Sequence, residues 1–192
     1  RLVSALYGPT HATETDQGIN AYLEQLRLMD GATLQSEASG FARAMHDTGL
    51  VSPYHVVFLR FLVENHPAML PAGLGLSSTG TDALLTYRDL VHTLIKNAVT
   101  ITTPQAAYGL ARLLERGILY SPPVAPAFWR QIQLVVRPDV RERLRLVFGY
   151  DTDPEVHLLA GLMCVLGCPL GIGQGQNPTC QSARAISMWA CN

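Results

Sequence analysis

The sequence of 192 residues has very little lysine and few charged side chains of any kind. Lys96 is the only lysine, against thirteen arginines, and charged residues make up 15% of the chain. The formal net charge of −1 argues against the basic surface typical of nucleic-acid-binding proteins. A GC-rich genome explains the preference for arginine. The alternative is avoidance of lysine modification, which hints at a secreted bacterial effector or toxin acting in a host cell.

The chain also lacks an apolar run long enough to span a membrane. The longest uncharged stretch covers residues 156–183, but its apolar part, residues 158–170, is shorter than the roughly 20 residues that a membrane helix needs. The first seven residues are too short for a secretory signal. We therefore expect no transmembrane segment. Because the chain starts with Arg and stops inside an apparently helical run, we interpret it as a fragment or processed part of a longer protein.

Cysteine is scarce and confined to the last 30 residues, at Cys164, Cys168, Cys180 and Cys191. A disulfide framework is typical of small, cysteine-dense secreted chains, and this chain is neither. The spacing C-x3-C-x11-C-x10-C lacks the C-x2-C pair common in zinc sites. We therefore expect no metal and no other cofactor, and interpret Cys164 and Cys168 as small buried apolar side chains one helical turn apart.

Hydrophobic residues make up 48% of the chain, enough for a sizeable core. Their spacing is mainly helical: one segment follows the i, i+3, i+4, i+7 pattern at Ile19, Tyr22, Leu23, Leu26 and Met29. The predicted fold class is mainly α, a compact multi-helix domain over residues 1–192. Three prolines predict a stiff connector, and a sub-boundary, near residues 121–126.

Capping signals place further elements. Ser52-Pro53 combines an N-cap with proline at the first helical position and predicts a helix over residues 54–64. Glycine, proline and serine predict a loop over residues 66–81. Further helices are expected over 37–46, 82–95 and 104–115 and from 154 onward, while 128–136 fits helix or strand. The arginine-rich residues 137–145 are interpreted as a solvated helix face, with a phosphate-binding patch as the alternative.

The segment with the clearest chemistry is residues 167–189. Glycines at 167, 171, 173 and 175 allow tight turns, and Asn177-Pro178 then predicts a helix start that makes Cys180 the third helical residue. Free N–H groups and the positive dipole end stabilise a thiolate there, and the same N–H groups stabilise the oxyanion of an attacked acyl group. The amide of Gln174 or Gln176 is a candidate second donor. Four apolar residues are expected to anchor this helix to the core: Ala183, Ile186, Met188 and Trp189.

The interval from Gln174 to Cys180 resembles the papain-like superfamily of cysteine proteases and related bacterial effector enzymes. In that superfamily a Gln lies six residues before a catalytic Cys at the start of a buried helix. The resemblance covers about twenty residues. It implies Cys180 as nucleophile, Gln174 as oxyanion-hole donor, and acyl chemistry on a protein substrate by a protease, deamidase or transglutaminase-like enzyme. It also implies that this chain is the helical part of an α+β papain-like fold.

Two features depart from the papain-like pattern. Gln181 follows the cysteine where papain has an aromatic residue. The family's His and Asn or Asp lie downstream of the cysteine, whereas none of the last twelve residues here is histidine. Those partners therefore lie on a missing C-terminal segment or a second chain, or the arrangement is permuted. Within this chain, His157 and His92 are the candidate general bases.

Other interpretations remain open. Cys180 is equally compatible with a buried structural thiol. The glycines before the last helix are also compatible with phosphate binding, although the stretch lacks the Gly-Lys-Ser/Thr of a P-loop. As an alternative to an enzyme, the chain is a non-catalytic helical domain that docks onto a partner protein or onto another part of its own chain.

Overall fold

The computed structural model describes residues 2–15, 17–151, 153–171 and 180–191, and does not describe the side chains of Cys180 and Gln181. The described residues form helices and no strand, which confirms the prediction of a mainly α, multi-helix fold. No helix among them is long and apolar enough to cross a membrane. The α-helices are α1 (Leu2–Tyr7), α2 (Ile19–Leu28), α3 (Gly31–Thr48), α4 (Pro53–Asn65), α5 (Leu70–Leu74), α6 (Ser78–Thr86), α7 (Arg88–Ala98), α8 (Ala106–Glu115), α9 (Val124–Ile132), α10 (Pro138–Phe148), α11 (Pro154–Gly167) and α12 (Cys180–Cys191), and the 3-10 helices are η1 (His11–Thr13), η2 (Pro67–Met69), η3 (Ile118–Tyr120) and η4 (Pro169–Gly171).

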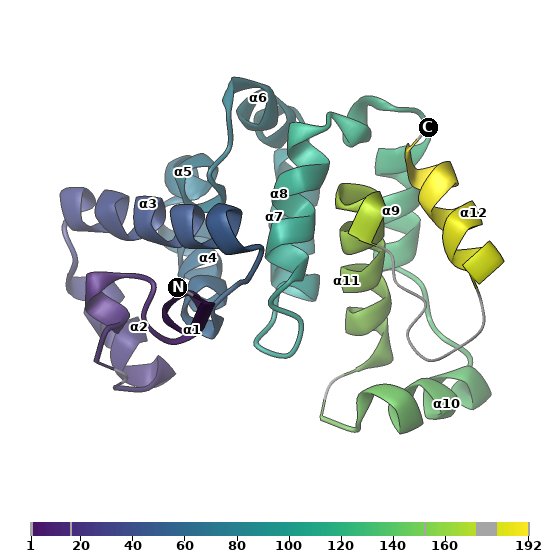
Figure 1. The fold of residues 1–192 in the computed structure, drawn as a ribbon, viewed down its shortest axis with the longest axis horizontal. Coiled ribbons are helices and arrows are strands. Elements are labelled where there is room, and N and C mark those ends of the chain that lie inside the picture. Colours follow the sequence, from purple (N-terminus) through teal and green to yellow (C-terminus); the bar gives the residue numbers. More distant parts are fainter. Residues whose placement is uncertain (1, 16, 152, 172–179, 192) are drawn as a thin grey trace.

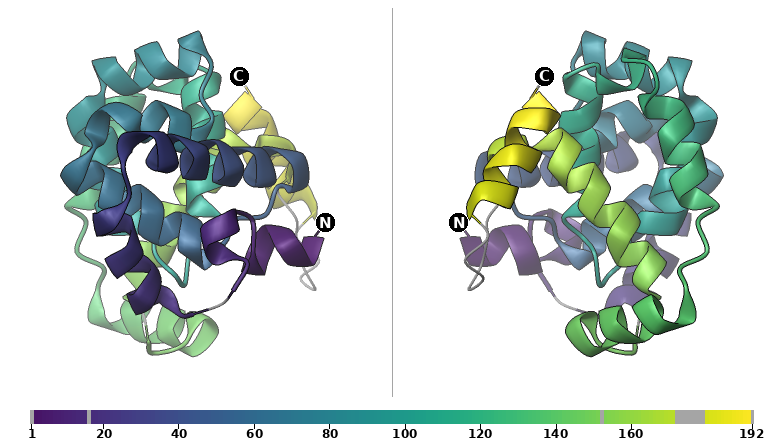
Figure 2. Two further views of the ribbon diagram at one scale, coloured as in Figure 1. Left: turned by 90° about the vertical axis from the view of Figure 1, so that its left-hand side faces the viewer. Right: turned by 90° about the vertical axis from the view of Figure 1, so that its right-hand side faces the viewer.

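The helices form two groups on either side of α7 and α8 (Figure 1). On one side, α2 packs on α4, and α3 packs on α1 and α5. On the other side, α11 packs against α7 and, most extensively, against α8, while α10 and α12 are attached at its periphery. Viewed from the N-terminal side, α3 lies across the front of the molecule (Figure 2). Buried apolar side chains of both groups join in one continuous core.

The predicted N-cap of α4 is confirmed. The Ser52 hydroxyl oxygen accepts a hydrogen bond from the backbone N–H of Tyr54 at 3.2 Å, and Pro53 is the first residue of α4. The preceding helix, α3, ends at Thr48, and its C-cap is Gly49, whose φ of 71° lies in the left-handed region that glycine adopts most readily. Local sequence is sufficient at both points because each helix end is fixed by groups adjacent in the chain.

Four sequence predictions about element boundaries are wrong. The expected loop over residues 66–81 contains η2, α5 and the start of α6, because its prolines occupy first helical turns, where their missing N–H is harmless. The expected helix over 82–95 is divided at Tyr87 between α6 and α7. Helix α3 begins at Gly31, where Asp30 accepts a hydrogen bond from the Thr33 N–H at 2.7 Å. Residues 124–132 form α9, which shortens the expected connector.

Helices α8 and α11 approach each other backbone to backbone at Gly109 and Gly167. A Cβ atom on Gly109 of α8 would lie 2.8 Å from the backbone N and Cα atoms of Cys164 in α11. A Cβ atom on Gly167 would collide with the carbonyl oxygen of Gly109. The two backbones therefore touch, and both positions require glycine for reasons of space.

Two imidazoles stabilise the C-terminal end of α5 from the helices packed around it. The Nε2 of His55 in α4 donates to the carbonyl oxygen of Gly73 at 2.8 Å, and the Nε2 of His46 in α3 donates to that of Leu74 at 3.0 Å. His55 is buried and stacks on Phe41, with ring centroids 4.9 Å apart. Burial lowers the pKa of His55 to about 4, so the folded protein holds it neutral at physiological pH.

We expect Gly167→Ala to lower the free energy of unfolding by about 1–3 kcal/mol, because the new methyl group forces α8 and α11 apart. Urea unfolding followed by circular dichroism measures the change. Gly161→Ala is the matched control on the same helix, because a Cβ atom there meets nothing within 4 Å. The control should stabilise the protein by roughly 0.5–1 kcal/mol, as alanine replaces glycine in a helix. Equal effects of the two substitutions would contradict the close crossing.

We expect the protein to lose stability between pH 6.5 and about 4, partly through His55. In this window the unfolded chain binds a proton at His55 that the folded state rejects, so the free energy of unfolding falls as the pH falls, by up to roughly 3 kcal/mol. Urea titrations at pH 7 and pH 4.5 measure this loss. In His55→Gln the loss should be smaller, whereas in His66→Gln, which removes an exposed imidazole, it should match the wild-type loss. An unchanged pH dependence in His55→Gln contradicts the assignment.

Candidate functional site

Cys180 is the first described residue of α12, and the predicted helix start at Pro178 lies outside the described residues. Residues 172–179, Gln174 and Gln176 among them, lie outside the described residues, as does the side chain of Cys180. The oxyanion-hole role of Gln174 and the nucleophilic role of Cys180 therefore stay predictions. What the structure contributes is the helix that follows the thiol and the contacts of that helix.

Arg116 joins the C-terminal ends of α11 and α12. From the residue after α8, its Nη1 donates to the carbonyl oxygen of Leu166 at 2.5 Å and its Nη2 donates to that of Ala190 at 3.1 Å. These carbonyls belong to last helical turns and have no partner within their own helices. The Ser187 hydroxyl also donates to the carbonyl oxygen of Pro169 at 2.7 Å. Helix α12 is thus held mainly near its C-terminal end.

The start of α12 lies away from the start of α11. The two helices meet near their C-terminal ends and diverge toward their N-terminal ends (Figure 2, right). His157 belongs to the first turn of α11, whereas Cys180 is the first described residue of α12. The fold therefore does not place these two helix starts side by side.

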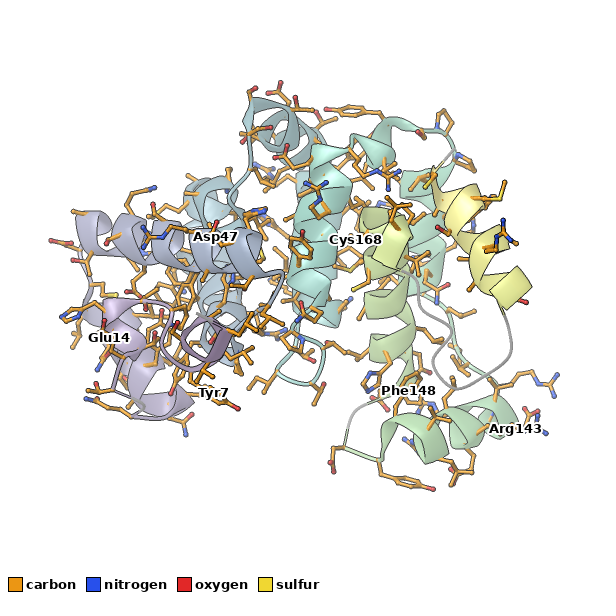
Figure 3. The ribbon with its side chains drawn as sticks, viewed as in Figure 1. Tyr7, Glu14, Asp47, Arg143, Phe148 and Cys168 are labelled. Carbon is orange, nitrogen blue, oxygen red and sulfur yellow. The ribbon has the colours of Figure 1, made fainter. Side chains whose placement is uncertain are left out.

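His157 lies at the junction of α10 and α11. It stacks on Phe148, with ring centroids 4.5 Å apart and an interplanar angle of 12°, and Phe148 is labelled at this junction in Figure 3. The Nε2 atom of His157 is buried without a hydrogen-bond partner among the described residues. The stacking indicates that this imidazole packs α11 against α10.

His92, the second candidate base, belongs to α7. Its Nε2 is likewise buried without a partner in the described part of the chain. The pKa of His92 lies below its ordinary value, mainly because the ring is partly buried and secondly because Arg88 carries a positive charge nearby. Helix α7 packs on α4, α6, α9 and α11, while α12 packs on α11 and η4. Among the described residues, neither His92 nor His157 forms an ion pair with a carboxylate.

The other three cysteines are free thiols in different environments. Burial raises the pKa of Cys164 to about 11, and its Sγ donates to the carbonyl oxygen of Gln105 at 3.6 Å. Burial also raises the pKa of Cys168 (Figure 3), while Cys191 is exposed. No group of three potential metal ligands occurs within the described ranges.

Three of the four apolar side chains expected to anchor α12 to the core are exposed, contrary to the sequence prediction, and only Ala183 of the four is partly buried. Ala190 is buried and Ala183 is half-buried, but Met188 is 64% and Trp189 is 70% exposed, and Ile186 is also exposed. The hydrophobic character of these residues was recognised in the sequence, but the side of the helix that meets α11 was not. We call Ile186, Met188 and Trp189 the outward face of α12.

The structure also contains a groove that the sequence analysis missed. It has a volume of about 840 Å³ and lies over α4, between α2 and the turn that joins α7 to α8. Its basic side chains are Arg27, Arg60 and Lys96, which come from three different helices. Sequence spacing within one helix cannot reveal such a convergence. The one sequence feature that could have indicated a site here is Lys96, the only lysine, which directly follows the apolar residues Leu94 and Ile95. The apolar lining is Ile19, Leu23, Val56, Val57, Phe61, Ile101 and Val156.

No model of a known protein family, no curated protein and no solved structure matches this chain.

Proposed function

We propose that this chain is a helical protein-interaction domain that binds a partner protein through the outward face of α12. Single exposed apolar side chains are common on protein surfaces and need no special explanation. The supporting observation is that α12 buries Ala190 and half-buries Ala183, while its isoleucine, methionine and tryptophan are exposed. Tryptophan is enriched among the residues that dominate binding energy at interfaces, and methionine adapts to irregular partner surfaces.

The charge of α12 indicates the kind of surface that it binds. Arg184 is the only charged side chain between residues 180 and 191, and α12 contains no acidic residue. A complementary partner therefore presents an apolar cavity that accepts an indole ring, with an acidic rim near Arg184. Because α12 is attached at the edge of the domain, a partner reaches this face without displacing the core.

The test of this proposal is site-specific photo-crosslinking in the cells that produce the protein. A benzophenone amino acid at position 189 should crosslink to one protein species, whereas the same group at position 85, an exposed leucine site on α6, should not. Met188→Ser should reduce the crosslink by roughly tenfold or more, as expected for an interface residue worth about 2 kcal/mol.

Stability separates an interface role from a folding role. Because Met188 is exposed, Met188→Ser should change the free energy of unfolding by no more than about 0.5 kcal/mol. Crosslinking of equal yield from positions 85 and 189 contradicts the proposal. A large loss of stability in Met188→Ser also contradicts it, because the side chain would then pack within the domain itself.

A second candidate function is acyl transfer by the thiol of Cys180, and the position of this residue in the first described turn of α12 supports it. In this reaction the thiolate attacks an amide carbon and forms a C–S bond, and the oxyanion is held by first-turn N–H groups and by Gln174. The C–N bond then breaks and the amine leaves with a proton from an imidazole. Water hydrolyses the thioester in a protease or deamidase, whereas an amine accepts the acyl group in a transglutaminase-like enzyme.

Alkylation kinetics test the acyl-transfer candidate. At neutral pH, iodoacetamide should label Cys180 at least about tenfold faster than Cys191, and the labelling of Cys180 should persist below pH 7, because the helix start lowers its thiol pKa. Mass spectrometry of the peptides measures both rates in the same chain. Cys191 serves as the control because it is a free, exposed thiol on the same helix. Labelling of Cys180 no faster than that of Cys191 rules out an activated nucleophile.

A further inference from the structure

The groove over α4 combines an apolar floor with basic side chains at its edge. Val57 and Phe61 lie one helical turn apart on α4, Leu23 comes from α2, and Ile101 comes from the turn after α7. Its volume of about 840 Å³ lies in the range of roughly 300–1,000 Å³ that is typical of sites for small organic molecules. The floor provides contacts for an apolar ligand body.

The position of Arg60 within the groove is fixed by α7. Its Nη1 donates to the carbonyl oxygen of Lys96 at 2.7 Å and lies 3.4 Å and 3.3 Å from those of Ile95 and Val99. These carbonyls form the negative end of the α7 dipole, which holds the guanidinium in place. No acceptor among the described residues takes the Nε and Nη2 hydrogens of Arg60, so these donors are available to a ligand.

The charge of the groove favours an anion. Arg27, Arg60 and Lys96 face only one lining carboxylate, that of Glu64. Within the described ranges, Arg60 and Lys96 form no ion pair, and Arg27 pairs with Glu24 at 2.8 Å on the exposed surface, where such a pair contributes little. Two cations from different helices therefore line the groove without a carboxylate partner.

We infer that this groove binds a small amphiphilic anion, a molecule with an apolar chain and one carboxylate or phosphate head group. The chain lies along the apolar floor, and the head group accepts hydrogen bonds from Lys96 and from the free donors of Arg60. A neutral or cationic amphiphile of equal length lacks these bonds and binds more weakly. The site is separate from α12 and does not depend on either function proposed above.

The sole lysine of the chain allows a direct test on the intact protein. Amine acetylation modifies only Lys96 and the terminal amine, and mass spectrometry distinguishes the two sites. Decanoate and decyl phosphate, used below their micelle concentrations, should each slow the acetylation of Lys96, and decyltrimethylammonium should not. The head group with the lower Kd in titration calorimetry identifies the preferred anion. Raising the salt concentration should weaken its binding.

Two groove variants and one control complete the test. Lys96→Gln should weaken the binding of the preferred anion by roughly tenfold, and Ile101→Ser, which changes an exposed lining residue, should weaken it to a similar extent. Arg130→Gln removes an exposed cation that does not line the groove and should leave the Kd unchanged. The proposal is overturned if neither anion binds, if decyltrimethylammonium binds as tightly as the anions, or if both groove variants bind like the unmodified chain.

Discussion

The close approach of α8 and α11 is the contact on which the C-terminal half of the molecule depends. Gly109 and Gly167 leave no room for a side chain, so the two helices meet backbone to backbone. This crossing brings Arg116 to the end of α11, where its guanidinium reaches carbonyl oxygens of two helices. Helix α12 then packs on α11 and η4 and is joined to Arg116, so its position is built on a contact between two glycines that lie 58 residues apart in the chain.

Polar side chains at helix ends recur as the means of joining elements in this fold. Arg116 binds the ends of α11 and α12, Arg60 binds the end of α7, and His46 and His55 bind the end of α5. The last carbonyl groups of a helix need partners outside it, and these four side chains supply them from neighbouring helices. At Arg60 this arrangement leaves further donors over a groove, so that one residue serves both the fold and a candidate binding site.

The sequence predicts a functional thiol at Cys180, whereas the described structure contains two candidate binding surfaces, the outward face of α12 and the groove over α4. Cys180 is the first described residue of α12, but the N-terminal ends of α11 and of the described α12 diverge, and the imidazole of His157 is packed on Phe148. The residues of the groove escaped sequence analysis because Arg27, Arg60 and Lys96 are distant in the chain and each looks like an ordinary surface cation. The outward face of α12 escaped it because hydrophobicity alone does not say which side of a helix meets its neighbour.

By itself the sequence determined the helical class, the N-cap at Ser52 and most helix locations, because these features depend on groups close together in the chain. Only the tertiary structure decided the division of α6 from α7, the helical path through the proline-rich residues 67–74, and the direction in which α12 presents its large side chains. Each of these depends on which surfaces meet after folding. Helix packing of this kind involves contacts between distant residues, like that between Gly109 and Gly167, which no local sequence pattern encodes.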